Sequence, residues 1–565
     1  MAGVAAALVA GVVAFVLFWP ASVHPESLLP QTAFLDSHVW GLDHIDRMIL
    51  GDVPFAPRTD RAGFPLLRRA PVLGWAPALM TLPFRGWVDP VAATLGVLLA
   101  SPALAALAAV AWLRQLGLRA GFAALAALTW AFSAPLLANL AAGNVDKAQV
   151  WVYPAWLALA RIAQTGSSRS RAAAVIGAGL VALAAAMTEP YLGLFLPLVS
   201  LPVLAVEVWG HANRRSAARW AAATFIATGL GLLPAAAWFA GQQDSVEPQV
   251  FWPSPPPLRG GVLSPDQLPY ADPLAFVWHG APADWTQPAH LVYLGFPLVL
   301  VAAWGLRRGA AGRRVPATLS LAALTVALGP VLVLGGGWFR VGGRVLLLPM
   351  AALEACGYPL VHGGAYYRAA PLVGLGAVAL AFGGLNQHAQ RGSAWGRRLA
   401  VLLAVLSTAD ALRVSGPWPR PAAALEGRDA AAFLAEAPRA GAVLMLPLAG
   451  DQATGGRKLL LAALAGRATS ALPRHLPTRM VAQETPWLRR WTDAARSGRV
   501  AGDVLAEAGF AYVLLTPLGD DEAPSLSGEA LESQLGAPIF VSGAYRVWEV
   551  RPATTTAPGP GPAAP

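Results

Sequence analysis

The chain has 565 residues, of which 56% are hydrophobic and only 13% are charged, and its mean hydropathy is +0.51. Soluble domains carry about 25% charged residues, so this composition excludes an ordinary soluble protein and indicates an integral membrane protein. The single cysteine, Cys356, excludes an intramolecular disulfide framework and a cysteine-based zinc site. The formal net charge is +10, and its meaning depends on where the basic residues lie.

Eleven mostly apolar stretches are long enough to cross a bilayer as helices, some of them with the help of their neighbours. The weakest is 148–159, which is short and contains Pro154. The sequence therefore predicts a polytopic α-helical membrane domain over residues 1–414 with about 11 transmembrane helices. We expect these helices at residues 2–19, 91–113, 121–140, 148–159, 172–187, 191–206, 220–240, 291–306, 316–335, 369–385 and 399–412.

The first apolar stretch is close in size to the hydrophobic region of a signal peptide. No basic residue precedes it and no clear Ala-x-Ala site follows it. These features favour a retained membrane anchor over a cleaved signal.

Arginine is concentrated in every second connection between the apolar stretches. Residues 114–119, 161–171, 207–219, 307–314 and 391–398 contain 15 Arg and one Glu, a net charge of +14, whereas the rest of the chain has a net charge of −4. Short loops with this bias lie on the cytoplasmic side. We therefore expect a protein of the inner (cytoplasmic) membrane with a cytoplasmic N-terminus and a periplasmic C-terminus. Nucleic acid is not an expected partner, because no basic face interleaved with aromatic residues is present.

Three long segments are expected outside the membrane. The external loops 21–90 and 241–290 are rich in Trp, Pro and carboxylates, which favours a lid along the membrane interface. Residues 415–552 contain β-rich runs at 442–448, 510–518 and 545–550 and helical patterns at 429–437 and 500–508, which predicts an extracytoplasmic α/β domain. The Pro-, Gly- and Ala-rich end, 553–565, is predicted to be a disordered tail.

An acidic segment, LDSHVWGLDHID at residues 35–46, follows the first apolar stretch. We expect one or two helical turns here, in which Asp36 and Asp43 face the same way because they are seven residues apart. A carboxylate near apolar surface can act as a general base; the alternative is that these acids are solvated or cap the helix. His38 and His44 raise the alternative of a divalent metal, but no third firm ligand accompanies them, so neither a metal nor another cofactor is expected.

Several motifs together resemble a known family. They are the acid within DSHVW, the LGDVPF turn at 50–55, the pair of apolar stretches that follows, GNVDKAQVWVYPAWLALA at 143–160, YLGFPLVL at 293–300 and VLMLPL at 443–448. In this combination the chain resembles the bacterial multi-spanning members of the GT-C superfold of glycosyltransferases, which take a sugar from a polyprenyl-phosphate carrier. The resemblance is firmest over roughly the first 165 residues.

The resemblance implies a mechanism and a set of site residues. Asp36 would be the catalytic base that accepts the proton of the acceptor nucleophile while the sugar leaves its lipid phosphate with inversion. The developing phosphate charge requires cations or hydrogen-bond donors. The alternative for each cation is a contact with lipid headgroups, and for Glu189 it is a place at a helix end. The residues expected to bind the substrate or donor are Lys147, Asp146, Glu189, His38, Asp43 and Arg368.

The leading functional hypothesis is a glycosyltransferase that moves a sugar from a polyprenyl-phosphate donor to a lipid, glycan or protein acceptor on the external face of the membrane. Membrane lipids are the other expected partners. Two alternatives remain: a non-catalytic transporter or lipid flippase, and an inactive GT-C-like scaffold for envelope assembly. The absence of a visible internal repeat disfavours the transporter.

Overall fold

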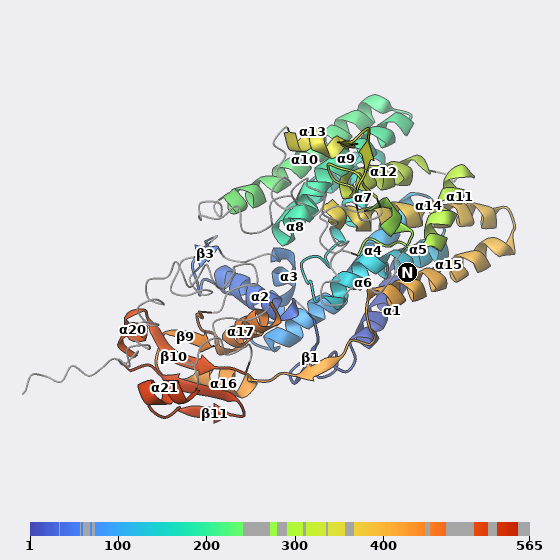
Figure 1. Cartoon of the computed structure of the whole chain (residues 1–565). Coiled ribbons are helices and arrows are strands. Elements are labelled where there is room, and N and C mark those ends of the chain that lie inside the picture. The colour runs from blue at the N-terminus through green and yellow to red at the C-terminus, as the bar shows by residue number, and fades with distance from the viewer. Residues whose placement is uncertain are drawn as a thin grey trace, which may run out of the picture. The chain divides into compact units, whose positions relative to one another are not determined.

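The computed structural model describes residues 1–32, 34–56, 58–59, 68–69, 74–240, 272–278, 291–308, 312–334, 337–355, 366–446, 452–470, 502–517 and 528–551 (Figure 1). The chain divides into two compact units, Met1–Asp52 with Val72–Ala424 and Val53–Pro71 with Leu425–Pro565. Each unit is considered by itself. The predicted tail, 553–565, and most of the predicted external loop 241–290 lie outside the described residues.

The first unit is helical, with a few very short strands. The helices are α1 (Ala2–Leu17), α2 (Leu35–Leu50), α3 (Trp75–Thr81), η1 (Leu82–Phe84), α4 (Pro90–Gln115), α5 (Ala120–Ala131), α6 (Ala134–Ala141), α7 (Val152–Thr165), α8 (Ser168–Thr188), α9 (Pro190–Gly210), α10 (Arg214–Ala240), η3 (Pro273–Phe276), α11 (Phe296–Arg307), α12 (Arg314–Ala327), α13 (Pro349–Ala355), η6 (Tyr366–Ala369), α14 (Ala370–Gln390) and α15 (Ala394–Ser415).

The polytopic α-helical fold predicted from the sequence is confirmed. Within the described residues, five helical stretches are long and apolar enough to cross a membrane, or six if α5 and α6, which are bent by 47°, form one broken span. Three shorter apolar helices, α1, α11 and α12, accompany them. All eleven predicted stretches contain helix, but eleven crossings remain a prediction. One boundary was wrong: α12 ends at Ala327, not at residue 335, and short strands follow it.

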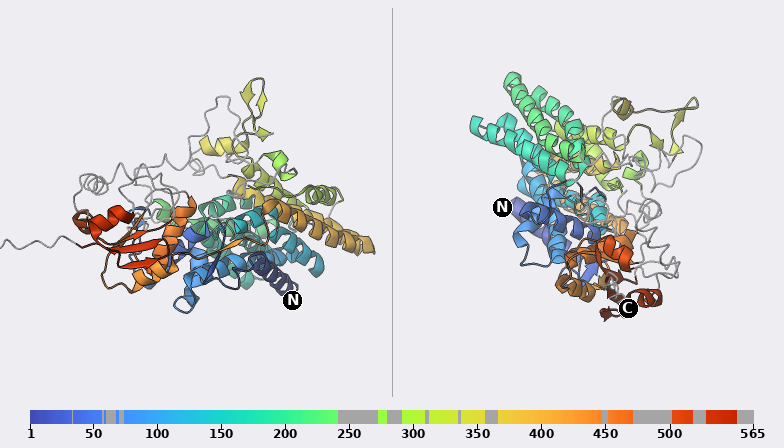
Figure 2. Two further views of the ribbon diagram at one scale, coloured as in Figure 1. Left: turned by 60° about the horizontal axis from the view of Figure 1, so that its bottom comes forward. Right: turned by 90° about the vertical axis from the view of Figure 1, so that its left-hand side faces the viewer.

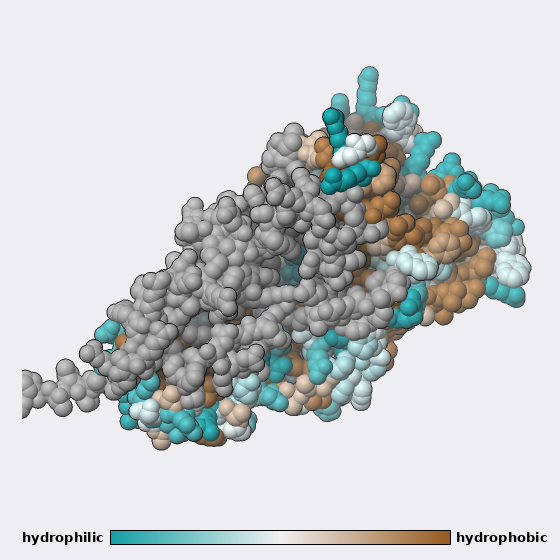
Figure 3. All heavy atoms as spheres, in the orientation of Figure 1, coloured by the Kyte–Doolittle hydropathy of each residue, from teal (hydrophilic) through white to brown (hydrophobic). Residues whose placement is uncertain are grey.

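The core of the first unit is built around α14, whose residues from Ala370 to Asn386 are all buried. Helices α5, α11, α12 and α15 pack against it, while α8 packs against α7 and α10. The outer helices expose large apolar side chains such as Leu8, Ile176 and Leu230, each at least 60% exposed. Figure 3 shows hydrophobic side chains gathered over the helices at the right of the view. Such a surface is suited to contact with lipid rather than water.

The arginine-rich connections predicted to share one side of the membrane contact one another. The Nε of Arg161 donates to the carbonyl of Gln115 at 3.1 Å, and its Nη1 lies 2.9 Å from Glu207. Arg171 donates to Ser216 at 3.3 Å. Three of the five basic connections, 114–119, 161–171 and 207–219, are therefore gathered in space, which supports the alternation read from the charges.

The beginning and end of the first unit are joined by a two-stranded antiparallel sheet. Strand β1 (Leu28–Pro30) pairs with β8 (Ala422–Ala424). The amide of Gln31 donates to the carbonyl of Pro421 at 2.7 Å, and the amide of Arg420 donates to the carbonyl of Leu17 at 2.8 Å. The segment that leads into α2 is thus held by residues nearly 400 positions later.

The second unit is an α/β domain, as predicted. Its four-stranded sheet has the order β11 (Phe540–Ser542), β12 (Tyr545–Glu549), β10 (Phe510–Leu515) and β9 (Ala442–Leu446), and only β9 and β10 are parallel. The central strand β10 is buried almost throughout, and Leu444, Val513 and Trp548 lie in its core. Its helices are α16 (Arg428–Glu436), α17 (Gln452–Ala465), α20 (Gly502–Glu507) and α21 (Gly528–Leu535), and a small hairpin, β2 (Arg58–Thr59) with β3 (Arg68–Arg69), also belongs to the unit.

Candidate functional site

The acidic segment after α1 forms a helix of four turns, longer than the sequence predicted. In α2 the apolar side chains of Val39, Trp40 and Ile45 are buried, and the polar side chains of His44 and Asp46 are buried with them. Gly51, with φ +84°, ends the helix in a left-handed conformation. Asp36 lies in the first turn and is partly exposed, a place where the helix dipole favours a negative charge.

The loop between α6 and α7 is pressed against the start of α2. The amide of Phe34 donates to the carbonyl of Ala142 at 3.0 Å. Gly143 has φ +70°, and a Cβ there would lie 2.7 Å from Thr32 Oγ1 and 2.9 Å from the amide nitrogen of Leu35. Only glycine fits this close approach without strain. The GNVDK turn and the first turn of α2 are therefore in direct contact.

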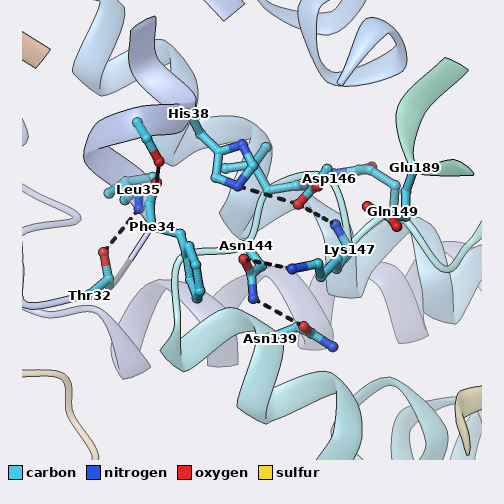
Figure 4. A network of polar contacts seen from close by, with 12 residues as sticks. Thr32, Phe34, Leu35, His38, Asn139, Asn144, Asp146, Lys147, Gln149 and Glu189 are labelled. Atoms are coloured by element: carbon cyan, nitrogen blue, oxygen red, sulfur yellow. Dashed lines mark hydrogen bonds and ion pairs between the residues drawn. The ribbon is translucent and has the colours of Figure 1, made fainter. Parts of the chain in front are cut away.

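Three of the predicted site residues meet in this turn (Figure 4). His38 Nε2 lies 3.3 Å from Asp146 Oδ1, and the amide of Lys147 donates to the same oxygen at 2.8 Å. The Lys147 ammonium lies 3.5 Å from Asn144 Oδ1 and 5.2 Å from the centre of the Phe34 ring. The Asp146 side chain is only 4% exposed. A buried carboxylate is thus surrounded by hydrogen-bond donors from its own turn and from α2.

Two further predicted residues join from the far part of the unit. Glu189, between α8 and α9, is 2% exposed, and Arg368 Nη1 donates to its Oε1 at 2.6 Å. The guanidinium also lies over the Tyr191 ring, 4.6 Å from its centre. Glu189 exchanges a hydrogen bond with Asp146, and Figure 4 shows Asp146 between His38 and Glu189. We call His38, Asp146, Lys147, Glu189 and Arg368 the charged network.

The two carboxyl groups of the charged network cannot both ionise freely, because they are buried together. Burial raises the pKa of Glu189, and the neighbouring Asp146 charge raises it further, against the opposing effects of Arg368 and Lys147. Burial alone would raise the pKa of Asp146, but His38 and Lys147 and its hydrogen bonds hold it below the ordinary value. Burial lowers the pKa of His38. The surroundings therefore favour the ionised form of Asp146 and the protonated form of Glu189.

The charged network brings two basic side chains, Lys147 and Arg368, together with two acidic ones, Asp146 and Glu189. The directions of the two carboxyl pKa shifts favour one carboxylate charge over two. Basic side chains in such a place can hold an anionic group such as a phosphate.

Asp43 is the predicted site residue that the structure places in a different group. It lies 2.9 Å from Arg47 Nε and 3.6 Å from Arg85 Nη2. Asp46, one turn further along α2, is 5% exposed and accepts a hydrogen bond from Thr81 at 3.4 Å. These ion pairs tie α2 to the segment after α3, and no contact in the described residues connects Asp43 to the charged network.

The two histidines of α2 have separate surroundings. His38 lies against Asp146, whereas His44 is buried and stacks on Trp40 with ring centres 5.0 Å apart. Among the residues that the structure describes, no group of three or more His, Cys, Asp or Glu side chains could hold a metal ion.

Sequence reasoning missed several residues that support the charged network. Asn144 is 1% exposed and links Lys147 to Asn139. Gln149 is fully buried and donates to Ser101 at 2.8 Å. A neutral amide in an apolar setting requires hydrogen-bond partners. The Asn and Gln that flank VDKA in the sequence could therefore have indicated a buried polar network at this turn.

Comparison with known proteins identifies the fold. No family model matches the chain, and no curated protein matches it. Among solved structures it is similar to the oligosaccharyltransferase of Archaeoglobus fulgidus in the apo form, at 13% identity and a TM-score of 0.51 over 91% of this chain and 69% of that one. It also matches the mycobacterial arabinofuranosyltransferase AftD (15% identity, 96% of this chain, 41% of that one, TM-score 0.49) and ArnT of Cupriavidus metallidurans bound to undecaprenyl phosphate (12% identity, 98% of each chain, TM-score 0.42).

The chain is thus a multi-pass membrane protein with the GT-C fold. This confirms the fold indicated by the sequence motifs. At 13% identity the likeness is one of fold.

We predict that Gly143→Ala destabilises the first unit. The positive φ alone would cost about 1–2 kcal/mol for a residue with a Cβ, and the methyl group would overlap Thr32 and Leu35. Thermal unfolding in detergent measures the loss. Gly96→Ala in α4 is the control, since its Cβ meets no atom within 4 Å; equal stability of the two variants would contradict the close approach at Gly143.

Asp46 gives a pH-dependent prediction. Burial raises its pKa from 3.8 to about 6, so the folded state prefers the protonated form and loses stability as the pH rises from about 4 to about 6. Asp46→Asn, which stays neutral, is expected to be more stable than the wild type by about 1–3 kcal/mol above about pH 7 and equally stable below about pH 4. The melting temperature at both pH values tests this, with the half-exposed Asp52→Asn as control. An Asp46→Asn gain that did not depend on pH would refute the prediction.

Proposed function

We propose that the chain is an inverting glycosyltransferase that moves a sugar from a polyprenyl-phosphate donor to a lipid, glycan or protein acceptor. We place the reaction on the external face of the inner membrane, with the N-terminus cytoplasmic and the C-terminal domain periplasmic. The arginine-rich connections support this orientation because short basic loops remain in the cytoplasm. The charged network belongs to connections of the opposite set.

One observation supports the proposal more strongly than the others. Residues from α2, the α6–α7 turn, the α8–α9 junction and η6 assemble a charged network that contains two basic side chains, Lys147 and Arg368, inside a GT-C fold. Basic side chains held in a buried setting can bind an anionic ligand through charge-assisted hydrogen bonds. In a membrane protein of this fold, the phosphate of a lipid carrier is the anion that fits.

Lys147 and Arg368 would hold the donor phosphate. Both remain cationic, and each is fixed by its neighbours: Lys147 by Asn144, and Arg368 by Glu189 and Tyr191. When the bond between the sugar carbon and the phosphate oxygen breaks, the oxygen keeps the electron pair. Cations positioned where this charge develops stabilise the transition state more than the ground state.

Asp36 would act as the general base. It lies in the first turn of α2, the helix that also carries His38, and it is partly exposed, so an acceptor could reach it. The acceptor hydroxyl gives its proton to the Asp36 carboxylate as its oxygen forms the new bond to the sugar carbon. Attack and departure occur on opposite sides of that carbon, which inverts it. A positioned carboxylate contributes about 10²–10⁴ in rate.

His38 and Asp146 would position this machinery rather than react. Asp146 accepts from the Lys147 amide and contacts His38, so it links the turn that carries the phosphate-binding cation to the helix that carries the base. Asp43 was also predicted to bind the donor. Its ion pairs with Arg47 and Arg85 favour support of α2, and through α2 of Asp36.

Asp36→Asn is expected to lower sugar transfer by about 10²–10⁴-fold, because the amide cannot accept the proton. The assay is transfer from a radiolabelled polyprenyl-phosphate sugar by purified protein in lipid nanodiscs, together with thermal unfolding. Asp52→Asn, the same change two residues past the end of α2's final turn, is the control and keeps full activity. Normal transfer by a folded Asp36→Asn protein would remove the base from the mechanism, and no transfer by the wild type with any donor would favour a transporter or a scaffold.

The protonation of Glu189 predicts how donor binding depends on pH. Its raised pKa means that the proton is lost at a higher pH than from an ordinary carboxyl group; the network then gains a negative charge and the KM for the donor increases. Glu189→Gln stays neutral, so its KM does not increase in that pH range. Glu207→Gln is a matched control, because Glu207 is another buried carboxylate paired with an arginine, Arg161, at 2.9 Å. Parallel pH profiles for wild type and Glu189→Gln would contradict the assignment.

A further inference from the structure

A small β-structure follows the short helix α12. Strand β4 (Val333–Leu334) pairs with β5 (Gly337–Trp338), and β6 (Arg340–Val341) pairs with β7 (Arg344–Val345), both antiparallel. Gly342 and Gly343 form the outer turn with φ +58° and +79°, the conformation of a tight hairpin turn. In the left view of Figure 2 these strands stand clear of the helices of their unit. The described residues 331–334 and 337–348 are called the hairpin below.

The hairpin exposes apolar side chains that no described element of its unit covers. Val341 is 60% exposed, Leu347 is 68% exposed, and Leu334 and Phe339 are each more than a third exposed. The helix η3 packs against β4 and adds Leu274 at 50% exposure. Trp278, directly after η3, is 75% exposed. Contiguous exposed apolar surface of this kind marks an interaction site.

The charges of the hairpin indicate what kind of partner it binds. Arg340 and Arg344 flank the outer turn and are exposed, and no acidic residue occurs between positions 331 and 353. In the observed register Arg344 lies opposite Val341, and Arg340 lies opposite Val345, so each side of the hairpin has apolar residues with an arginine at the tip. Apolar side chains with arginines beside them match the boundary between acyl chains and anionic headgroups.

The length of α12 places the hairpin at that boundary. The helix has 14 residues, about 21 Å at 1.5 Å per residue, whereas the hydrocarbon layer is about 30 Å thick. Helix α12 begins at Arg313 and Arg314, within a basic connection. With α12 crossing as predicted from the basic connection, a chain that leaves it at Ala327 approaches the boundary of the opposite leaflet, which is where the hairpin follows.

The backbone of the hairpin is suited to a poorly hydrated layer, where unpaired peptide groups are costly. The amide of Leu332 donates to the carbonyl of Leu346 at 3.1 Å, and the amide of Leu346 donates to the carbonyl of Phe339 at 3.0 Å. The amide of Phe339 donates in turn to Leu332 at 2.9 Å. The two strand pairs are thereby joined into one hydrogen-bonded structure.

We infer that the hairpin is a membrane-surface anchor whose exposed apolar side chains enter the outer boundary of the bilayer and whose two arginines bind the phosphates of anionic lipids. The anchor fixes the segment between α12 and η6 at the membrane surface. It does not depend on the chemistry proposed for the charged network, so either can fail without the other.

The anchor is tested by the position of a fluorophore relative to lipid. In a Cys356→Ser background, Val341→Cys is labelled with an environment-sensitive dye, and the protein is placed in nanodiscs of phosphatidylcholine and phosphatidylglycerol that carry nitroxide-labelled acyl chains. We expect the emission at Val341 to shift to the blue and to lose at least half as much intensity as at Leu8→Cys on the outer face of α1. Val541→Cys in the second unit is the exposed control, since Val341 and Val541 are 60% and 56% exposed.

Two further arms define the outcome. In Val341→Cys carrying Arg340→Gln and Arg344→Gln, quenching is expected to lose its dependence on the phosphatidylglycerol fraction while some quenching persists in phosphatidylcholine. Val341 emission that nitroxide lipid does not quench overturns the anchor, and protection from both the lipid and aqueous iodide means instead that protein covers the hairpin. An unchanged phosphatidylglycerol dependence in the double variant overturns the role of the arginines.

Discussion

The buried carboxylate of Asp146 is the constraint on which the rest of the site depends. At 3% exposure, an isolated charge would be strongly unfavourable, and it persists only because donors surround it. Those donors come from its own turn and from α2, and Glu189 at the α8–α9 junction shares a hydrogen bond with it. Satisfying one acid therefore brings together segments that are distant in the sequence. The same arrangement holds Lys147 and Arg368, the two basic side chains proposed to bind a phosphate.

Much of the architecture followed from patterns that depend on composition and local geometry. Long apolar stretches gave the helices of the first unit, and the alternating arginine content identified connections that contact one another through Arg161 and Arg171. In the second unit, strands β9, β10 and β12 coincide with the β-rich runs. The broken pair α5–α6 and the early end of α12 were missed, because apolar character alone does not tell a continuous helix from a bent one or from an apolar hairpin.

The charged network could be foreseen only residue by residue. Acidic and basic residues in short connections on one side suggested His38, Asp146, Lys147, Glu189 and Arg368, and the structure brings these five together. Spacing on a helix was less informative: Asp36 and Asp43 do lie on one helix, but Asp43 is bound by Arg47 and Arg85. Such ion pairs depend on the position of Arg85, which follows α3 and cannot be placed from the sequence. Asn144 and Gln149, which support the network through hydrogen bonds, are neutral, so no pattern of charges in the sequence pointed to them.

The pairing of β1 with β8 has a consequence for the order in which the molecule is built. The segment before α2 is held by Arg420 and Pro421, 389 residues after Gln31 in the case of Arg420. At synthesis rates of about 5–20 residues per second, those partners emerge some tens of seconds after it. Throughout that interval the segment preceding Asp36 lacks its final strand partner. Helix α15 must be made before the segment ahead of α2 is locked, so a chain truncated before α15 would lack the contact that fixes the approach to α2.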